Sequence, residues 1–170
     1  QLQQSFGIIT LAIVSGRPKV LNLLEVIEHF IDFRREVVRR RIEFELRKAE
    51  ARAHILEGLK IALDHLDEVI KLIRGSKNPA EARDGLMTQF KLSLLQSQAI
   101  LDMQLQRLTG LERQKIVDEL VELLKTIERL RAILSSDELL MAVVLNELKA
   151  VRDNYSDERR TVIVEESGEF

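Results

Sequence analysis

Apolar residues recur at alternating intervals of four and three over the first half of the chain. The series is Ile42, Leu46, Ala49, Ala53, Leu56, Leu59, Leu63, Leu66, Ile70 and Ile73. One 3-3 step, at Ala53–Leu56–Leu59, lies beside Gly58. Such a stripe is typical of a coiled-coil seam, and the additional interval of three indicates local overwinding. We expect one helix over residues 23–74, a rod of about 75 Å at 1.5 Å per residue.

Two further stripes follow in the second half of the chain. The first is Ile116, Leu120, Leu123, Ile127, Leu130 and Leu134, and the second is Leu139, Leu140, Val143, Val144, Leu148 and Val151. They predict helices over 110–134 and 136–154 that return along the first helix as an antiparallel arm, interrupted at Ser135-Ser136. A compact helical bundle with an overlong first helix is the alternative that periodicity leaves open.

Helix starts are marked by a capping residue followed three positions later by Glu or Gln, which satisfies two amide groups of a first turn. The pattern occurs at Asn22–Glu25, Asn78–Glu81, Ser93–Gln96, Thr109–Glu112 and Ser135–Glu138. Pro79 reinforces the second start, because its missing N–H costs nothing at the first helical position. These starts add two short helices, over 79–90 and 94–107.

Residues 6–21 have a different pattern from the rest. β-Branched and aliphatic residues run up to Ser15-Gly16, and a second apolar stretch follows Pro18, which predicts a β-hairpin. A lone hairpin is marginally stable in water, so we interpret it as the tail of a larger preceding domain. The predicted fold is mainly α, with a hairpin tail (1–21), a long arm helix (22–74), a globular tip (75–109), returning helices (110–155) and a C-terminal extension (156–170).

The segment LSLLQSQAILDMQLQRLTG, residues 92–110, contains only two charged side chains, Asp102 and Arg107. On a helical projection Leu94, Leu101, Leu105 and Leu108 lie within about 60° and can pack against the arm, while further apolar residues lie on other sides. A small tip cannot bury a helix on all sides, so we predict that the second face binds an identical copy in a two-fold dimer. The residues assigned to this homodimer gate are Leu95, Ala99, Ile100, Met103, Leu108 and Leu111.

Composition agrees with long helices: the 170 residues include two prolines, no cysteine and 32% charged residues. The net charge of −2 indicates no particular partner. Without cysteine, disulfides and thiolate metal sites are excluded. No segment reaches the roughly 18 apolar residues of a membrane span, so we expect a soluble, intracellular chain with no membrane partner.

Candidate chemistry is sparse. His29, His54 and His65 are eleven or more positions apart, whereas a helical metal pair needs ligands three or four apart, so we predict no metal site. Tyr155, the only tyrosine, lies near a helix end and is interpreted as a packing residue. No P-loop, GxSxG or glycine-rich nucleotide turn is present. We therefore predict no catalytic or cofactor-binding residue in this chain.

Arg39, Arg40 and Arg41 form the strongest basic cluster and could make weak contacts with DNA phosphates. The acids Glu36, Glu43 and Glu45 lie at helical pair spacing, which favours a neutralised, solvated face instead.

Two places could let the arm bend. One is Gly58, and the other is Ser135-Ser136. If bending at Gly58 matters, we expect Gly58→Ala to stiffen the arm, with a gain in helix propensity of up to about 1 kcal/mol.

Several long motifs match one family. FELRKAEARAHILEGLKIALDHLDEVIKLIR (44–74), QAILDMQLQRLTGLE (98–112) and DERRT (157–161) closely resemble the A-subunit family of bacterial DNA gyrase and topoisomerase IV. The upstream stretch FGIITLAIVSGRPKVLNL (6–23) resembles the gyrase branch more than the topoisomerase IV branch.

The resemblance implies the coiled-coil arm and exit gate of a type IIA topoisomerase. In that family two A subunits cut one DNA duplex, pass a second through the break and release it between the two arms. The resemblance also implies two further partners, duplex DNA and a B subunit. It places ATP and Mg²⁺ on other domains or on the B subunit, and it implies a cytoplasmic, chromosome-associated bacterial protein. No position here matches the family's catalytic tyrosine, its neighbouring arginine or its metal-binding acids.

The tip departs from the usual family pattern at a few positions. Leu94-Leu95 replaces a typical Ser-Glu pair, Ser97 replaces Ala, and Gln104 replaces Arg. These changes remove charge from the tip.

Two alternatives stay open, namely a coiled-coil scaffold that dimerises along its seam and a basic-helix DNA-binding module. A tip contact keeps the arms apart, whereas a scaffold brings them together along their length.

Overall fold

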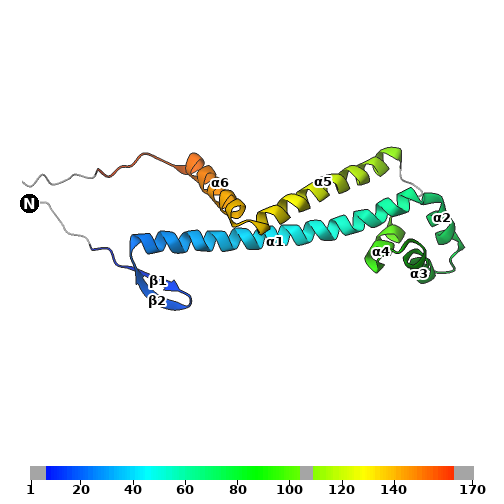
Figure 1. Cartoon of the computed structure of the whole chain (residues 1–170), viewed down its shortest axis with the longest axis horizontal. Helices are drawn as coiled ribbons and strands as arrows, with labels where there is room; N and C mark the ends of the chain where they lie inside the picture. Colours follow the sequence, from blue (N-terminus) through cyan, green and yellow to red (C-terminus); the bar gives the residue numbers. More distant parts are fainter. Residues whose placement is uncertain (1–6, 104–108, 163–170) are drawn as a thin grey trace, which may run out of the picture. The chain divides into compact units, whose positions relative to one another are not determined.

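The structure, a computed structural model, describes residues 7–103 and 109–162. By their contacts the residues form two compact units, one within 1–38 and 137–170 and the other from Arg39 to Ser136. Helix α1 (Leu23–Asp64) contributes to both units (Figure 1). The predicted fold, mainly helical with a short N-terminal hairpin, is confirmed.

The hairpin consists of strands β1 (Thr10–Val14) and β2 (Arg17–Leu21), which pair antiparallel with Thr10 opposite Leu21. The two turn residues both have positive φ, 50° at Ser15 and 77° at Gly16. Positive φ at both central positions is the geometry of a two-residue hairpin turn whose twist matches that of the strands. The predicted turn at Ser15-Gly16 is therefore confirmed.

Helix α1 begins with the reciprocal cap that the sequence predicts. The Glu25 amide donates to Asn22 Oδ1 over 2.9 Å, and the Asn22 amide donates to Glu25 Oε2 over 2.9 Å. Lys19 Nζ donates to the second Glu25 carboxylate oxygen over 3.0 Å. These bonds, the backbone bond with Asn22 first, hold the pKa of Glu25 below its ordinary value of 4.5. The Glu25 carboxylate thus joins the hairpin to the helix, because one oxygen accepts from Lys19 of β2 and the other from the Asn22 amide.

In the same unit, α6 (Asp137–Tyr155) is tied to the first part of α1 by two ion pairs. Arg34 donates to Glu147 over 2.7 Å, and Arg35 pairs with Asp137. Val38, Leu140 and Val144 are buried. Of the apolar stripe predicted for this helix, Leu140 and Val144 are therefore buried, whereas Leu139 and Val151 are exposed.

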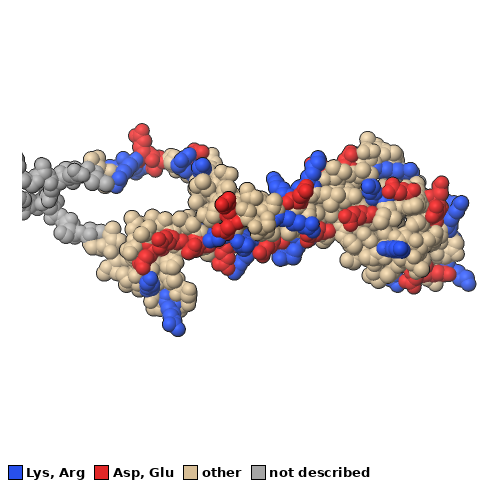
Figure 2. Space-filling view, in the orientation of Figure 1, with Lys and Arg blue, Asp and Glu red and all other residues tan. Residues whose placement is uncertain are grey.

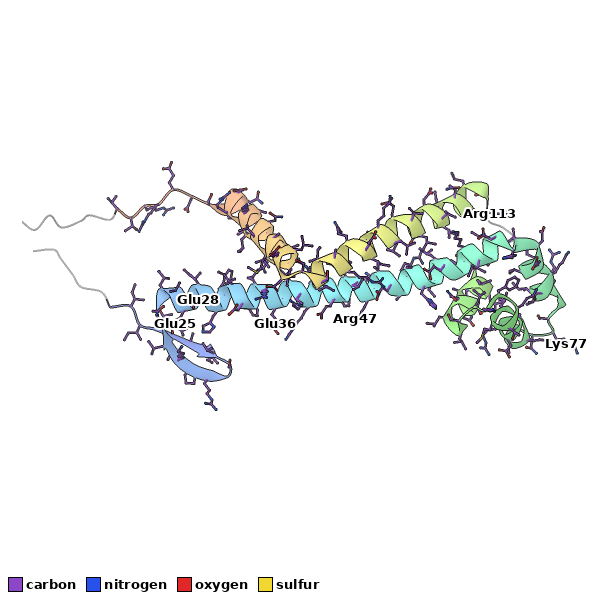
Figure 3. All side chains as sticks on the ribbon, viewed as in Figure 1. Glu25, Glu28, Glu36, Arg47, Lys77 and Arg113 are labelled. Carbon is purple, nitrogen blue, oxygen red and sulfur yellow. The ribbon has the colours of Figure 1, made fainter. Side chains whose placement is uncertain are left out.

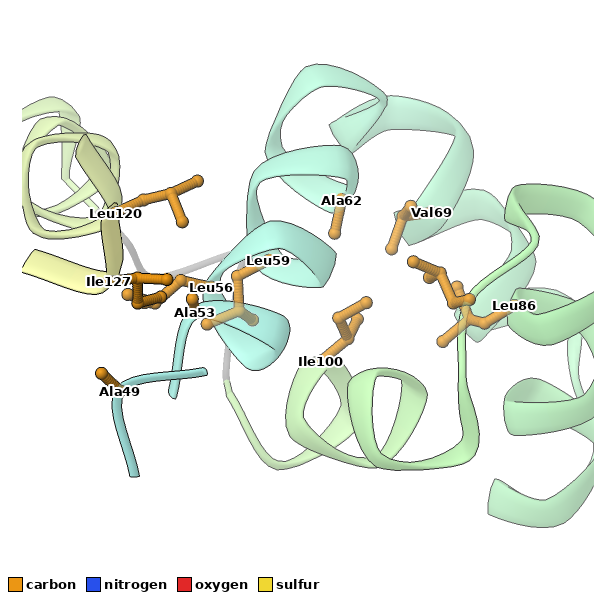
Figure 4. Packing of buried hydrophobic residues seen from close by; sticks show 11 residues of the cluster. Ala49, Ala53, Leu56, Leu59, Ala62, Val69, Leu86, Ile100, Leu120 and Ile127 are labelled. Atoms are coloured by element: carbon orange, nitrogen blue, oxygen red, sulfur yellow. The ribbon is translucent and has the colours of Figure 1, made fainter. Parts of the chain in front are cut away.

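In the second unit, the later part of α1 and α5 (Gly110–Ser135) form the predicted antiparallel seam. Arg131 near the end of α5 donates to Glu50, whereas Arg113 near its start shares a pocket with Leu63. Figure 4 shows the small residues Ala49 and Ala53 near Ile127, with Leu56 beside them. Every seam residue that the pattern assigned to the two helices is buried or half-buried. The arm prediction is confirmed for this unit.

The predicted single helix 23–74 is wrong at one point. His65 interrupts it (φ −117°, ψ 37°), and α2 (Leu66–Gly75) begins anew. Asp67 and Glu68 lie in the first turn of α2, where carboxylates interact favourably with the helix dipole. At this break the His65 ring lies 5.7 Å from that of Phe90.

Two further boundaries differ from the prediction. Helix α4 (Leu94–Asp102), which follows α3 (Pro79–Phe90), stops before 107, because Met103 has extended backbone (ψ 117°). Ser135 does not cap the last helix; it ends α5, and its hydroxyl donates to the Ala132 carbonyl over 2.8 Å.

Candidate self-association site at the helical tip

The tip consists of α2, α3 and α4 packed on the end of α1 (Figures 1 and 4). Its interior contains Leu59, Val69, Leu86 and Ile100, each with at most 1% of its surface exposed. These residues belong to the same apolar cluster as the arm seam. The apolar core of the tip is therefore a continuation of the arm core.

Helix α4 is fixed to α1 by polar groups at its first turn. The Gln96 amide donates to Ser93 Oγ over 3.2 Å, and the Ser93 amide donates to Gln96 Oε1 over 2.9 Å, so the predicted capping box forms. The same Gln96 side chain donates from Nε2 to the His54 carbonyl of α1 over 2.8 Å. His54 Nε2 forms a 2.8 Å hydrogen bond with Ser93 Oγ. One cap therefore orients α4 and attaches it to the arm.

Gly58 makes this close approach possible. A Cβ at Gly58 would lie 2.6 Å from both Cβ and Cγ of Gln96, a distance that carbon atoms do not tolerate. Gly58 is buried within continuous helix α1. Alanine there would collide with α4, so the expectation of a simple propensity gain on Gly58→Ala is wrong. Whether the arm bends at Gly58 stays a prediction.

The two faces of α4 are not the ones that the projection assigned. The buried face is Gln96, Ser97 and Ile100, and the exposed side includes Leu94 and Leu95, with 52% and 63% of their surface exposed.

The assignment of Ile100 to the gate is therefore corrected, because its side chain is fully buried in the core and offers no surface to a partner. Leu94, which we expected to pack inward, faces outward. Ala99 and Met103 are half-buried at the edge between the faces.

The remaining predicted gate residues lie after α4. Leu111, in the first turn of α5, has 68% of its surface exposed, and Leu108 lies outside the described residues, as does Gln104. Thr109 and Glu112 form the predicted capping box, and the bonds from the Thr109 amide and hydroxyl lower the pKa of Glu112. Among described residues, the exposed apolar positions predicted for the gate are thus Leu95 and Leu111.

Next to the outer face of α4 lies a groove of about 540 Å³ between α2, α3 and α4. Its apolar lining comes from Ile73, Pro79, Ala82 and Leu101, and Gln98 and Asp102 of α4 also line it. Lys77, in the loop between α2 and α3, lies at the same groove (Figure 3). The tip therefore combines two exposed leucines with an adjoining apolar depression.

The sequence pattern of the family described as the A subunit of DNA gyrase/topoisomerase IV matches residues 1–149. This chain belongs to that family. It is 58% identical over 163 residues to the DNA gyrase A subunit of Clostridium acetobutylicum, with 96% of this chain and 20% of the relative covered. It is 59% identical over 162 residues to that of Halalkalibacterium halodurans (95% and 19%), and 54% over 162 residues to that of Staphylococcus aureus strain MRSA252 (95% and 18%). The chain spans about one fifth of the length of these relatives.

In this gyrase/topoisomerase IV family member, the arginine cluster on α1 is engaged within the chain. Arg39, Arg40 and Arg41 each take part in an interaction, and Arg41 lies 3.9 Å from Glu45. Figure 2 shows basic and acidic side chains next to one another over the arm. A contact with DNA would compete with these internal pairs. The weak DNA contact stays a prediction.

The placement of possible metal ligands and the hydropathy of the helices bear on two further predictions. The described residues contain no group of three or more His, Cys, Asp or Glu side chains placed to hold a metal ion. No described helix combines the length and hydropathy that crossing a bilayer requires.

The attachment of α4 to α1 through His54, Gly58 and Gln96 is what sequence analysis missed. The available signal was a small residue one turn after a histidine, on a helix otherwise rich in long side chains. That signal does not identify its partner, because Gln96 is distant in the chain. The outward direction of Leu94 was missed for the same reason.

Proposed function

We propose that this chain is the arm and exit gate of a type IIA DNA topoisomerase A subunit. Two copies meet reversibly through their tips, and the transported duplex leaves between them. The observation that carries this proposal is the outer face of α4, which presents Leu94 and Leu95 to solvent while its opposite face is fixed to the arm. An exposed apolar surface on a helix whose opposite face is attached to the arm is suited to a partner.

The other parts of the proposed enzyme lie outside this chain. The expected partners are a B subunit, duplex DNA and a second A subunit. ATP and Mg²⁺ act on other domains or on the B subunit, so the chain alone is catalytically inactive. The expected location is the bacterial cytoplasm, at the chromosome. Family membership supports these proposals, and the chain's coverage of one fifth of its relatives leaves room for the remaining domains.

A gate must open as well as close, which favours a small contact. Interfaces below about 1,200 Å² tend to be transient, whereas obligate dimers commonly bury more than about 2,000 Å². α4 has nine residues, and its exposed apolar surface is concentrated in its first turn. A contact of this size can part while other regions of the enzyme hold the subunits together.

A scaffold that dimerises along the arm is the second candidate. Val121 and Leu124 of α5 each have 45% of their surface exposed and line a groove with Lys125 and Glu128. Such a stripe could bind the arm of another copy.

Spin labels distinguish the two candidates, since the chain has no cysteine and accepts one label per variant. Asp84→Cys places a label on α3 of the tip, and Lys48→Cys places one on α1 of the arm. In a tip dimer the distance between labels is shorter for Asp84→Cys than for Lys48→Cys. The reverse order, or a chain that stays monomeric at high concentration in sedimentation, would contradict the exit-gate proposal.

A further inference from the structure

We infer that the arm has a docking site for an acidic segment of a partner protein, on the face of α1 that is centred on Phe44. This site, the Phe44 patch, consists of Phe44 and its helical neighbours Arg40, Arg41, Arg47 and Lys48. The partner segment pairs its carboxylates with the four cations and places one apolar side chain on the Phe44 ring. The inference goes beyond the proposed gate and does not depend on it, because the patch needs no second copy of the chain.

Phe44 is an aromatic side chain that the fold leaves uncovered. It lies two positions from both Ile42 and Leu46, and is therefore about 200° from each around the helix. Ile42 is buried, and Leu46 packs against the apolar cluster of the seam. Phe44 consequently points away from the seam, and 60% of its surface is exposed. Covering such a ring with an apolar side chain of a partner is favourable.

Cations occupy all four positions next to Phe44 on this face. Residues three and four apart are neighbours on a helix surface, with Cβ atoms about 5–6 Å from one another. For Phe44 these neighbours are Arg40 and Arg41 toward the start of α1, and Arg47 and Lys48 toward its end. All four are exposed. An apolar centre within a basic surround is the result.

The acids nearest in sequence lie at the borders of the patch. Glu43 and Glu45 are each one position from Phe44, so they point about 100° away from it, one to either side. Arg41 lies 3.9 Å from Glu45, which offsets one cation at that border. Because the chain as a whole has a net charge of −2, the patch is a local excess of positive charge. Its electrostatic complement is a cluster of carboxylates.

The combination of charges with an exposed ring favours a peptide segment over a DNA duplex. A duplex presents phosphates to the cations, but its base faces are stacked inside, so the Phe44 ring would gain no apolar contact. An acidic peptide can supply both carboxylates and one apolar side chain. Protein interfaces commonly have this arrangement, with an aromatic residue at the centre and polar groups at the rim. The patch rises only about 12 Å along α1, which suits a short segment.

Fluorescence anisotropy with two labelled peptides tests the site. One peptide alternates Glu and Asp around a single central Leu, and the other has Ser in place of that Leu. We expect the chain to bind the Leu peptide at least about fivefold more tightly than the Ser peptide. Both affinities should fall as the salt concentration rises, because exposed charges are screened.

Two substitutions distinguish the charged and the apolar parts of the patch. Arg47→Glu should weaken both peptides at least about tenfold, because it places a carboxylate against those of the partner. Phe44→Ala should weaken the Leu peptide at least about fivefold and leave the affinity for the Ser peptide unchanged. Arg129→Glu and Val121→Ala, both at exposed positions of α5, are the matched controls and should change neither affinity. Circular dichroism checks that every variant keeps its helices.

A labelled DNA duplex and a labelled oligothymidine strand are the competing ligands. Tighter binding of either than of the Leu peptide, lost in Arg47→Glu, assigns the patch to nucleic acid and overturns the inference. Equal affinity of wild type and Arg47→Glu for the Leu peptide, or no binding by wild type, also overturns it, since the cations then serve only to keep Phe44 hydrated. None of these measurements depends on whether the chain dimerises, so failure of the docking site and failure of the gate are distinguishable.

Discussion

In the second unit, the contact that α1 makes with α5 in the arm differs in kind from the contact that it makes with α4 in the tip. Between α1 and α5 the contact is a repeated apolar seam, with Ala49, Ala53 and Ile127 buried along it. Between α1 and α4 the apolar contact of Ile100 is accompanied by polar bonds: Gln96 and Ser93 bond to His54 where Gly58 leaves room. The seam is built from many similar residues, whereas the tip attachment adds a few specific polar bonds to its apolar contact.

The seam is tested most strongly at Leu56, which has no exposed surface. Leu56→Ala removes buried carbon atoms and leaves a cavity, so the free energy of unfolding should fall by about 2–5 kcal/mol. Urea unfolding followed by circular dichroism measures the loss. Leu124→Ala, at a 45% exposed position, is the control and should cost much less. Equal losses at both positions would contradict the assigned seam.

The tip attachment is tested at Gly58. Gly58→Ala places a methyl group 2.6 Å from Gln96 carbons, and overpacking of this kind costs about 1–3 kcal/mol. Hydrogen exchange should show faster opening of α4 while α5 amides keep their protection. Gly75→Ala is matched, because a methyl group there would have no atom within 4 Å, and it should be neutral or slightly stabilising. Slower exchange of α4 in Gly58→Ala would show that the arm gains more than the tip loses.

A substitution at Ser97 is expected to raise the free energy of unfolding, in contrast to the two preceding substitutions. Its side chain is fully buried, and Oγ has no hydrogen-bond partner among the described residues. Since an unsatisfied buried polar group costs about 1–3 kcal/mol, Ser97→Ala should stabilise the chain by about 1 kcal/mol. Thermal unfolding detects this as a raised Tm. A lowered Tm would indicate that the hydroxyl bonds in solution.

The smallest expected effect concerns an ion pair on the surface of the arm. Arg52 donates to both oxygens of Glu119, over 2.8 and 3.0 Å, and its hydrogen bond lowers the pKa of Glu119 from 4.5. Because the folded pKa is depressed, the stabilisation is present above pH 4.5 and is lost as the pH falls through the folded value. Exposed pairs contribute about 0.2–1 kcal/mol.

Comparison of wild type with Glu119→Gln in urea titrations between acidic and neutral pH tests this contribution. The difference in unfolding free energy should be largest at neutral pH and shrink in acid. A difference that grows in acid would contradict the assigned pair.

The contrast between arm and tip also explains what the sequence could predict. The hairpin turn, four helix starts and the arm seam follow from local rules, namely turn residues, caps and apolar spacing. At the break, the His65 ring lies beside that of Phe90, and the direction of Leu94 follows from where α4 is attached. Both features involve residues far apart in the chain. Of the residues predicted for the self-association site, Leu95 is exposed as expected and Ile100 is buried instead; the site itself stays a prediction.

Gln96 uses its two side-chain atoms for two helices: the oxygen closes the first turn of α4, and the nitrogen binds the backbone of α1. Fraying of the first turn of α4 and its detachment from α1 are consequently coupled, since each breaks a bond of Gln96. We expect any separation of two tips to proceed by displacement of intact helices, with the secondary structure of α4 preserved throughout.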